Sequence, residues 1–171
     1  MLTVLITTSG TGSRLGDLTN YTNKSLVPIG DKYCISHIID LYPNNTEFVI
    51  TLGYFGNLVK DFLELAYPEK SFKFIDVNPY KGPGSSLGFS MLQASKFLQK
   101  PFIFHACDTI IKDKNLNISL DNNWIAGTIS NLESNQYRTF NVSDNKVIKI
   151  NEKDENKYDY IYIGLAGIKD Y

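Results

Sequence analysis

Short apolar runs alternate with segments of helical periodicity along the first two thirds of the chain. Each run holds few polar side chains and leads into a turn, which is typical of a buried strand. Such strands are predicted at residues 2–7, 48–52, 72–77 and 102–106. The stretches between them repeat apolar residues every three or four positions, the spacing of one helical face. Helices are therefore predicted over residues 35–42, 58–65 and 85–98.

The third of these helices carries two further predictions. Its apolar spacing places Leu87, Met91, Leu92 and Ser95 along one face. Either Ser85 or Ser86 is expected to be its N-cap, because a serine oxygen can accept a bond from a free N–H group of the first turn.

The last third of the chain changes to strands. The pattern predicts a strand at residues 125–129, a hairpin formed by residues 137–142 and 146–150, and a final strand at residues 160–168. The hairpin turn is expected at Ser143-Asp144-Asn145, since these residue types favour tight turns.

Strands that alternate with helices imply parallel crossover connections. We therefore expect an α/β protein, a three-layer α/β/α sandwich with a mostly parallel central sheet. The 171 residues suit one domain spanning residues 1–171. The final strand is not followed by a closing helix, which suggests a chain truncated before a further segment.

Composition narrows the classes of partner. The chain has 17 basic and 18 acidic residues, so no basic excess favours nucleic acid. No apolar run is long enough to span a membrane. The cysteines, Cys34 and Cys107, form no C-x-x-C pair, which favours a reducing, cytoplasmic compartment.

A loop rich in small residues follows the first strand: Ser9, Gly10, Thr11, Gly12, Ser13 and Arg14. Ligands of parallel sheets bind beyond the carboxyl ends of the strands, and such a loop lets backbone N–H groups approach a phosphate. Arg14 adds a charged fork that suits phosphate oxygens. An ordinary strand-to-helix turn with a surface arginine explains the same residues equally well.

Two other phosphate-binding motifs do not fit. A dinucleotide fingerprint, G-x-G-x-x-G, would need glycine where Leu15 stands, which disfavours an NAD-binding domain. A Walker loop would need glycine before Lys24-Ser25, but Asn23 is there.

Three later positions could add chemistry to the loop. Lys24 opens an apolar, proline-containing turn, although by itself it is more typical of a solvated lysine. Asp108 ends the fourth strand, where its carboxylate could hold Mg²⁺ or cap a turn. His105 and Cys107 lie on the same strand, and we interpret both as core residues because no second Cys/His pair completes a metal site. The segment 80–88, which includes Gly84, Ser85 and Ser86, could contact a base or a phosphate.

Together these motifs resemble the nucleotidyltransferase superfamily that includes the sugar-1-phosphate and phosphocholine nucleotidyltransferases. That family has an opening strand, G-x-G-[ST]-R-[LM], then K-x-L-x-P, a strand-end aspartate and a later Glu-Lys pair. The matching residues here are 10–15, 24–28, Asp108, and Glu152 with Lys153. The resemblance covers essentially the whole chain, and it implies a Rossmann-like nucleotidyltransferase fold.

The resemblance also implies roles. Arg14 would contact the β- and γ-phosphates of a nucleoside triphosphate, Lys24 the α-phosphate, and Asp108 a Mg²⁺ ion. Residues 82–88 would lie beside the base, and Glu152 and Lys153 would face the acceptor. The reaction would transfer a nucleoside monophosphate from CTP, UTP or dTTP to a phosphorylated small molecule and release pyrophosphate. That acceptor would be a sugar-1-phosphate, phosphocholine or a similar precursor of surface polysaccharide or capsule.

The chain also departs from the family. Leu87 lies about where uridine- and thymidine-specific members have a base-binding Gln, so the base stays open. The family's second metal-binding aspartate is expected in a segment after Tyr171. A non-catalytic nucleotide- or sugar-phosphate-binding domain of a larger protein is therefore the alternative. The sequence leaves the oligomeric state open.

Overall fold

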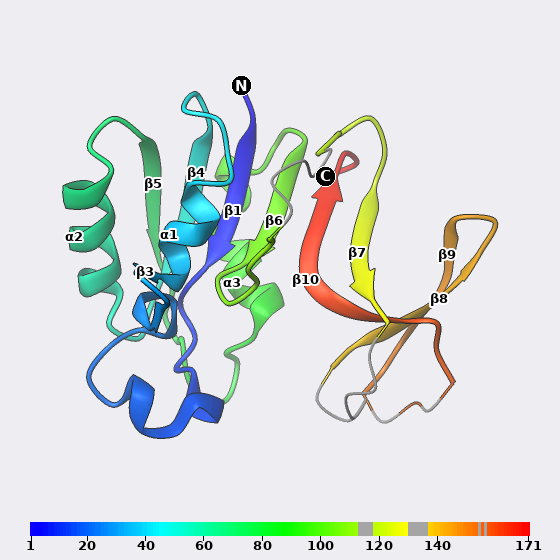
Figure 1. Ribbon diagram of the computed structural model, residues 1–171, viewed down its shortest axis with the longest axis horizontal. Coiled ribbons are helices and arrows are strands. Elements are labelled where there is room, and N and C mark those ends of the chain that lie inside the picture. Colours follow the sequence, from blue (N-terminus) through cyan, green and yellow to red (C-terminus); the bar gives the residue numbers. More distant parts are fainter. Residues whose placement is uncertain (113–117, 130–136, 154, 156) are drawn as a thin grey trace.

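The computed structural model describes residues 1–112, 118–129, 137–153, 155 and 157–171. Its centre is an eight-stranded sheet in the order β5-β4-β1-β6-β10-β8-β9, with β7 paired to β10 (Figure 1). The predicted α/β fold is confirmed. Figure 1 shows a helix-covered half on one side of the view and a half made of strands on the other.

The helix-covered half contains the parallel strands β1 (Thr3–Thr7), β4 (Glu47–Leu52), β5 (Ser71–Asp76) and β6 (Phe102–Ala106). β1 lies between β4 and β6 and pairs with both in parallel. The carboxyl ends of β1 and β6 therefore meet at one edge of the sheet, where parallel sheets bind their ligands. All four strands were predicted to within one residue at each end.

The other half is antiparallel. β10 (Tyr160–Ile168) pairs with β6, with β7 (Trp124–Thr128) and with β8 (Thr139–Ser143), and β8 pairs with β9 (Lys146–Asn151). The predicted hairpin is confirmed. Its turn residues Asp144 and Asn145 have φ of 50° and 58°, the left-handed conformation that a tight hairpin turn requires.

Helices cover both faces of the parallel strands, as a three-layer sandwich requires. α1 (Cys34–Ile39) and α2 (Gly56–Ala66) pack in one core with Val4 and Ile6 of β1. α3 (Leu87–Gln93) and the 3-10 helix η3 (Ser95–Phe97) lie against the other core, which contains Leu5. Alternate residues of β1 thus serve opposite layers, as the two-residue period of a strand dictates. In the part of the chain that is described, every helix is too short or too polar to cross a lipid bilayer.

One helical prediction was wrong in detail. α3 ends at Gln93 and gives way to η3, so no continuous helix spans residues 85–98. Its expected apolar face is also wrong, since Leu87 and Leu92 are 50% and 65% exposed, whereas Ser90 and Ala94 are buried. Ser90 tolerates burial because its hydroxyl is bonded to Ser86 and Ser9. The expected N-cap is confirmed at Ser86, whose oxygen accepts a bond from the Phe89 N–H.

Short elements connect β1 to α1 and carry the motifs. The 3-10 helix η1 (Ser13–Thr19) follows the glycine loop, and the 3-10 helix η2 (Lys24–Leu26) begins at the predicted catalytic lysine. A two-stranded hairpin of β2 (Pro28–Ile29) and β3 (Lys32–Tyr33) then leads into α1. Such short elements carry little periodicity, which is why the sequence did not predict them.

Candidate functional site

A cleft of about 510 Å³ opens at the carboxyl ends of β1 and β6. Its walls come from the loop after β1, the start of η2, the segment before α3 and the end of β6. Eight of the predicted site residues line it: Ser9, Gly10, Thr11, Arg14, Lys24, Ser85, Ser86 and Asp108. The fold therefore brings together segments that lie far apart in the sequence.

The loop after β1 is held by the turn that follows β4. The backbone N–H and the hydroxyl of Thr8 both donate to the Thr51 carbonyl, at 3.1 and 2.7 Å. The N–H of Tyr54 donates to the Ser9 carbonyl at 3.0 Å. Gly53 allows this approach, because a Cβ there would lie 2.5 Å from the Ser9 carbonyl oxygen. Gly10, by contrast, has open space where its side chain would be.

Gly12 and Ser13 do not line the cleft, and their role as nucleotide-binding residues stays a prediction. Gly12 has φ of 67°, and a Cβ there would lie 2.9 Å from the Cβ of Lys24. Its missing side chain therefore makes room for the stem of Lys24. Ser13 is the first residue of η1.

Lys24 and Asp108 form an ion pair in the cleft, with 3.0 Å between Nζ and Oδ2. Their side chains are 20% and 46% exposed. Burial alone would lower the pKa of Lys24, but Cys107 and Asp108 outweigh burial and raise that pKa. Burial also raises the pKa of Cys107 to about 12, so its thiol is neutral near pH 7. Asp108 is therefore the negative charge that keeps Lys24 protonated.

The lining carries more positive than negative charge. Arg14, Lys24 and Lys81 are its basic residues, and Asp108 is its acidic residue. Lys81 lies in the segment 80–88, which was predicted to contact a base or a phosphate, but Lys81 itself was not predicted as a site residue. The excess of cations suits a ligand with several negative charges, such as a polyphosphate.

Serine hydroxyls form hydrogen bonds along the side of the cleft made by α3 and the segment before it. Ser85 donates to the Gly82 carbonyl at 2.7 Å, and Ser90 donates to the Ser86 carbonyl at 3.1 Å. Ser9 and Ser90 lie 2.8 Å apart, oxygen to oxygen. Since the proton of Ser90 goes to Ser86, Ser9 is the donor of this second bond. Ser90 also lines the cleft, and sequence reasoning missed it as a site residue.

Gly84 does not line the cleft, and its nucleotide-binding role stays a prediction. It has φ of 87°, the left-handed conformation that glycine adopts most readily, in the turn before α3. Tyr80 lines the wall instead, with its ring centroid 6.4 Å from that of Tyr54.

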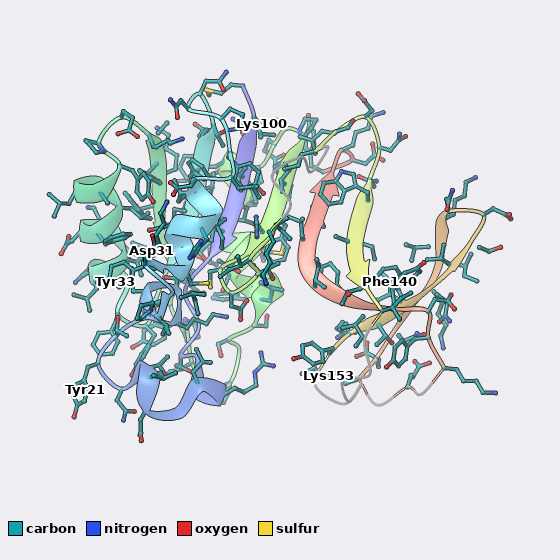
Figure 2. All side chains as sticks on the ribbon, viewed as in Figure 1. Tyr21, Asp31, Tyr33, Lys100, Phe140 and Lys153 are labelled. Atoms are coloured by element: carbon teal, nitrogen blue, oxygen red, sulfur yellow. The ribbon has the colours of Figure 1, made fainter. Side chains whose placement is uncertain are left out.

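Glu152 and Lys153 lie outside the cleft lining. Glu152 follows β9, and its carboxylate pairs with Arg138 at 2.6 Å. Figure 2 shows Lys153 beside the antiparallel half of the molecule, and its side chain is exposed. The structure does not bring these two residues to the glycine loop, and their acceptor-binding role stays a prediction.

Asp108 follows a strand whose histidine is used for packing in the core. His105 is buried, with Nδ1 2.8 Å from the Tyr42 hydroxyl and Nε2 2.9 Å from the Thr109 carbonyl oxygen. Both ring nitrogens are thus used in the core, as predicted, which excludes the soft-metal interpretation. Across the described ranges, no three His, Cys, Asp or Glu side chains cluster as a metal site. The role of Asp108 as a Mg²⁺ ligand stays a prediction.

Comparison with known proteins defines the fold. No protein-family model matches the sequence, and no curated protein matches it either. Among solved structures, a UDP-glucose pyrophosphorylase complexed with UDP-glucose superposes with a TM-score of 0.76 at 18% identity. The match covers 99% of this chain and 76% of that one.

The chain has the nucleotidyltransferase fold. Two further structures with this fold match 99% of the chain. The CTP:phosphocholine cytidylyltransferase of Streptococcus pneumoniae gives a TM-score of 0.74 at 19% identity, with 72% of its chain covered. The inositol-1-phosphate CTP transferase of T. maritima gives 0.74 at 15% identity, with 71% covered.

Proposed function

We propose that the protein is a nucleotidyltransferase, which moves a nucleoside monophosphate from a nucleoside triphosphate to a phosphorylated small molecule and releases pyrophosphate. One observation carries the proposal. On a nucleotidyltransferase fold, a cleft at the strand ends combines an open glycine loop with Arg14, Lys24 and Asp108. These are the residues that such a reaction needs to bind a triphosphate and to neutralise its charge.

The triphosphate would lie along the loop after β1. Arg14 is exposed at the start of η1 and would bind the β- and γ-phosphates through its charged fork. Lys24 is more enclosed and would contact the α-phosphate, where the bond is made and broken. Ser9, Gly10 and Thr11 would line the path of the nucleotide. Positioning and charge neutralisation then supply the catalysis, and no protein nucleophile is needed.

Asp108 would hold Mg²⁺ beside the phosphates. When bound, this ion would neutralise phosphate charge and help to orient the leaving pyrophosphate. In the structure, Asp108 accepts a hydrogen bond from Lys24 at 3.0 Å. Binding of the nucleotide would therefore exchange this ion pair for two separate contacts, Lys24 to phosphate and Asp108 to metal.

The base would lie against the segment before α3. Tyr80 offers an aromatic surface on this wall, and Ser85 and Ser86 add hydroxyl and backbone groups. Lys81 adds a hydrogen-bond donor, from which a carbonyl oxygen or a ring nitrogen of the base would accept. We propose CTP, UTP or dTTP as the triphosphate, since the structural neighbours include a UDP-glucose pyrophosphorylase and CTP transferases.

The acceptor would bind toward the antiparallel half, near Glu152 and Lys153. We propose a hexose-1-phosphate, phosphocholine or a similar precursor of surface polysaccharide or capsule. The named substrates of the structural neighbours, a sugar nucleotide, inositol phosphate and phosphocholine, support this class. We also propose that the protein acts in the cytoplasm, where the buried free thiols of Cys34 and Cys107 would stay reduced.

Pyrophosphate release tests the proposal. The protein would be incubated with Mg²⁺, each of CTP, UTP, dTTP and GTP, and a panel of hexose-1-phosphates, phosphocholine and inositol phosphate. Release that depends on both one triphosphate and one acceptor is the expected result, and Lys24→Ala is the matched inactive control. Thermal shift with the same triphosphates should show stabilisation by the preferred one. Stabilisation without any pyrophosphate release would instead favour a non-catalytic binding domain.

A further inference from the structure

Asn23 is fully buried directly before Lys24, and all of its side-chain hydrogen-bonding capacity is used. Its Nδ2 donates to the carbonyls of Thr8 and Tyr54, at 2.8 and 2.6 Å. Its Oδ1 accepts from the N–H and the hydroxyl of Ser25, at 2.9 and 2.8 Å. Because both partners of the nitrogen are carbonyls, the orientation of the amide is unambiguous.

These bonds join three segments that form the cleft. Thr8 is the last residue before the glycine loop, whereas Tyr54 belongs to the β4–α2 turn that holds Ser9. Ser25 is the residue after Lys24 in η2. Lys24 therefore lies between Asn23 and Ser25, and the side chain of Asn23 is hydrogen-bonded to Ser25.

These bonds determine the direction in which the side chain of Lys24 leaves the backbone. Asn23 caps η2 in an extended conformation, which fixes the backbone at the start of this 3-10 helix. From there, the stem of Lys24 passes the left-handed Gly12 and reaches Asp108. A three-residue helix cannot hold such a direction alone, since isolated turns of this length are unstable in water.

We propose that Asn23 is a positioning residue, which fixes the ammonium of Lys24 at the strand end through bonds to Thr8, Tyr54 and Ser25. Asn23 does not touch substrate in this arrangement, and its effect on turnover rests on the proposed function. A carboxylate could not replace the amide, because it would face two carbonyl oxygens. Alanine would leave both carbonyls without their donor and free the first turn of η2.

Competitive acylation of lysines tests the geometry without any enzymatic readout. Trace acetic anhydride would be reacted with the folded wild type and Asn23→Ala, and labelling at each lysine measured by mass spectrometry. We expect Lys24 to react at least about fivefold faster in Asn23→Ala, the factor that one lost hydrogen bond represents. Lys60, whose ammonium pairs with Glu64 on α2, is the internal control and should not change.

Asn151→Ala is the matched control variant. Asn151 is also fully buried, and its nitrogen donates to Thr139 and Asn141 at the β8–β9 hairpin. This variant should lose stability and leave the labelling of Lys24 unchanged. If Asn23→Ala does not fold, Ser25→Ala serves in its place, because it removes only the hydroxyl bond to Oδ1 and should raise Lys24 labelling to a smaller degree.

Turnover separates positioning from mere stability. Asn23→Ala should lower kcat by about ten- to a hundredfold with little change in KM for the triphosphate, as expected when a reacting group is misplaced. Asn23→Ala combined with Lys24→Ala should be no slower than Lys24→Ala alone. Unchanged labelling of Lys24 in a folded Asn23 or Ser25 variant would overturn the inference. The proposed function would not be affected by that result, because pyrophosphate release by the wild type tests it. Wild-type protein that releases no pyrophosphate would overturn the proposed function, and the labelling would still decide the geometry.

Discussion

The ammonium of Lys24 lies 3.0 Å from the carboxylate of Asp108, although 84 residues separate them in the sequence. The pair joins the start of η2 to the segment that follows β6. In the proposed nucleotide complex, Lys24 would contact phosphate and Asp108 would contact the metal ion, so this ion pair would be broken.

Lys24→Ala should act mainly on the chemical step. We expect kcat to fall by about a hundredfold or more, the scale observed when one preorganised electrostatic group is removed. KM for the triphosphate should change less, because contacts to the β- and γ-phosphates survive. Steady-state assays of pyrophosphate release provide the measurement. Wild-type turnover in Lys24→Ala would show instead that this residue is an ordinary surface lysine.

Asp108→Asn should abolish the dependence of nucleotide binding on Mg²⁺. The amide has nearly the shape of the carboxylate but is a much weaker ligand for a hard cation. The fold should persist, since the side chain is partly exposed. Calorimetric titration with the preferred triphosphate, with and without Mg²⁺, measures the effect. A variant whose affinity still rises with Mg²⁺ would contradict the metal role of Asp108.

Arg14→Ala should weaken triphosphate binding. The loss of a charge-assisted hydrogen bond to phosphate costs roughly 1.5–3 kcal/mol, which corresponds to about ten- to a hundredfold in affinity. Stability should stay the same, because Arg14 is exposed and lines the cleft. Binding of the triphosphate and of the corresponding monophosphate should be compared. An equal loss for both ligands would argue against a contact with the β- and γ-phosphates.

Gly53→Ala and Gly10→Ala should separate stability from ligand access. A Cβ at Gly53 would lie 2.5 Å from the Ser9 carbonyl oxygen, so its methyl group should destabilise the fold by about 1–3 kcal/mol. A Cβ at Gly10 has nothing within 4 Å and would point into open space. Gly10→Ala should therefore retain stability and change only nucleotide affinity. Urea denaturation and calorimetry of both variants measure the contrast, and equal stability of the two would refute it.

Acid should destabilise the protein through His105. Burial lowers the pKa of His105, against a smaller opposing effect of its bond to Thr109, so the folded state keeps the ring neutral. The unfolded chain takes up this proton near its ordinary pKa of about 6.5. The stabilisation is therefore complete above that value and is lost as the pH falls toward the folded pKa.

Urea denaturation measured from about pH 7.5 to pH 5 should show this loss, with a contribution of up to about 1.4 kcal/mol per pH unit. The loss should be shallower in His105→Gln. His37→Gln is the control, because that partly exposed histidine lies on α1, with its Nε2 2.9 Å from the Ile29 carbonyl oxygen. Parallel curves for wild type and His105→Gln would exclude His105 as the cause.

The local pattern determined the secondary structure wherever one periodicity dominated. The strands at 48–52 and 102–106 and the hairpin at Asp144 and Asn145 were predicted because burial and turn chemistry act within a few residues. The motifs also placed Arg14 and Asp108 at strand ends. Strand ends share an edge in any parallel sheet, so the cleft followed from the order of elements.

Only the tertiary structure decided which of those residues meet, because such contacts join segments that the sequence keeps far apart. The sequence could not show that Gly12 packs against the side chain of Lys24. Nor could it show that Ser9 bonds to Ser90, a polar residue that lies on the buried side of α3 while Leu87 is exposed. Periodicity predicts burial from the apolar character of the residues alone. A hydroxyl can also be buried when a partner, here 81 positions away in the sequence, completes its hydrogen bonds.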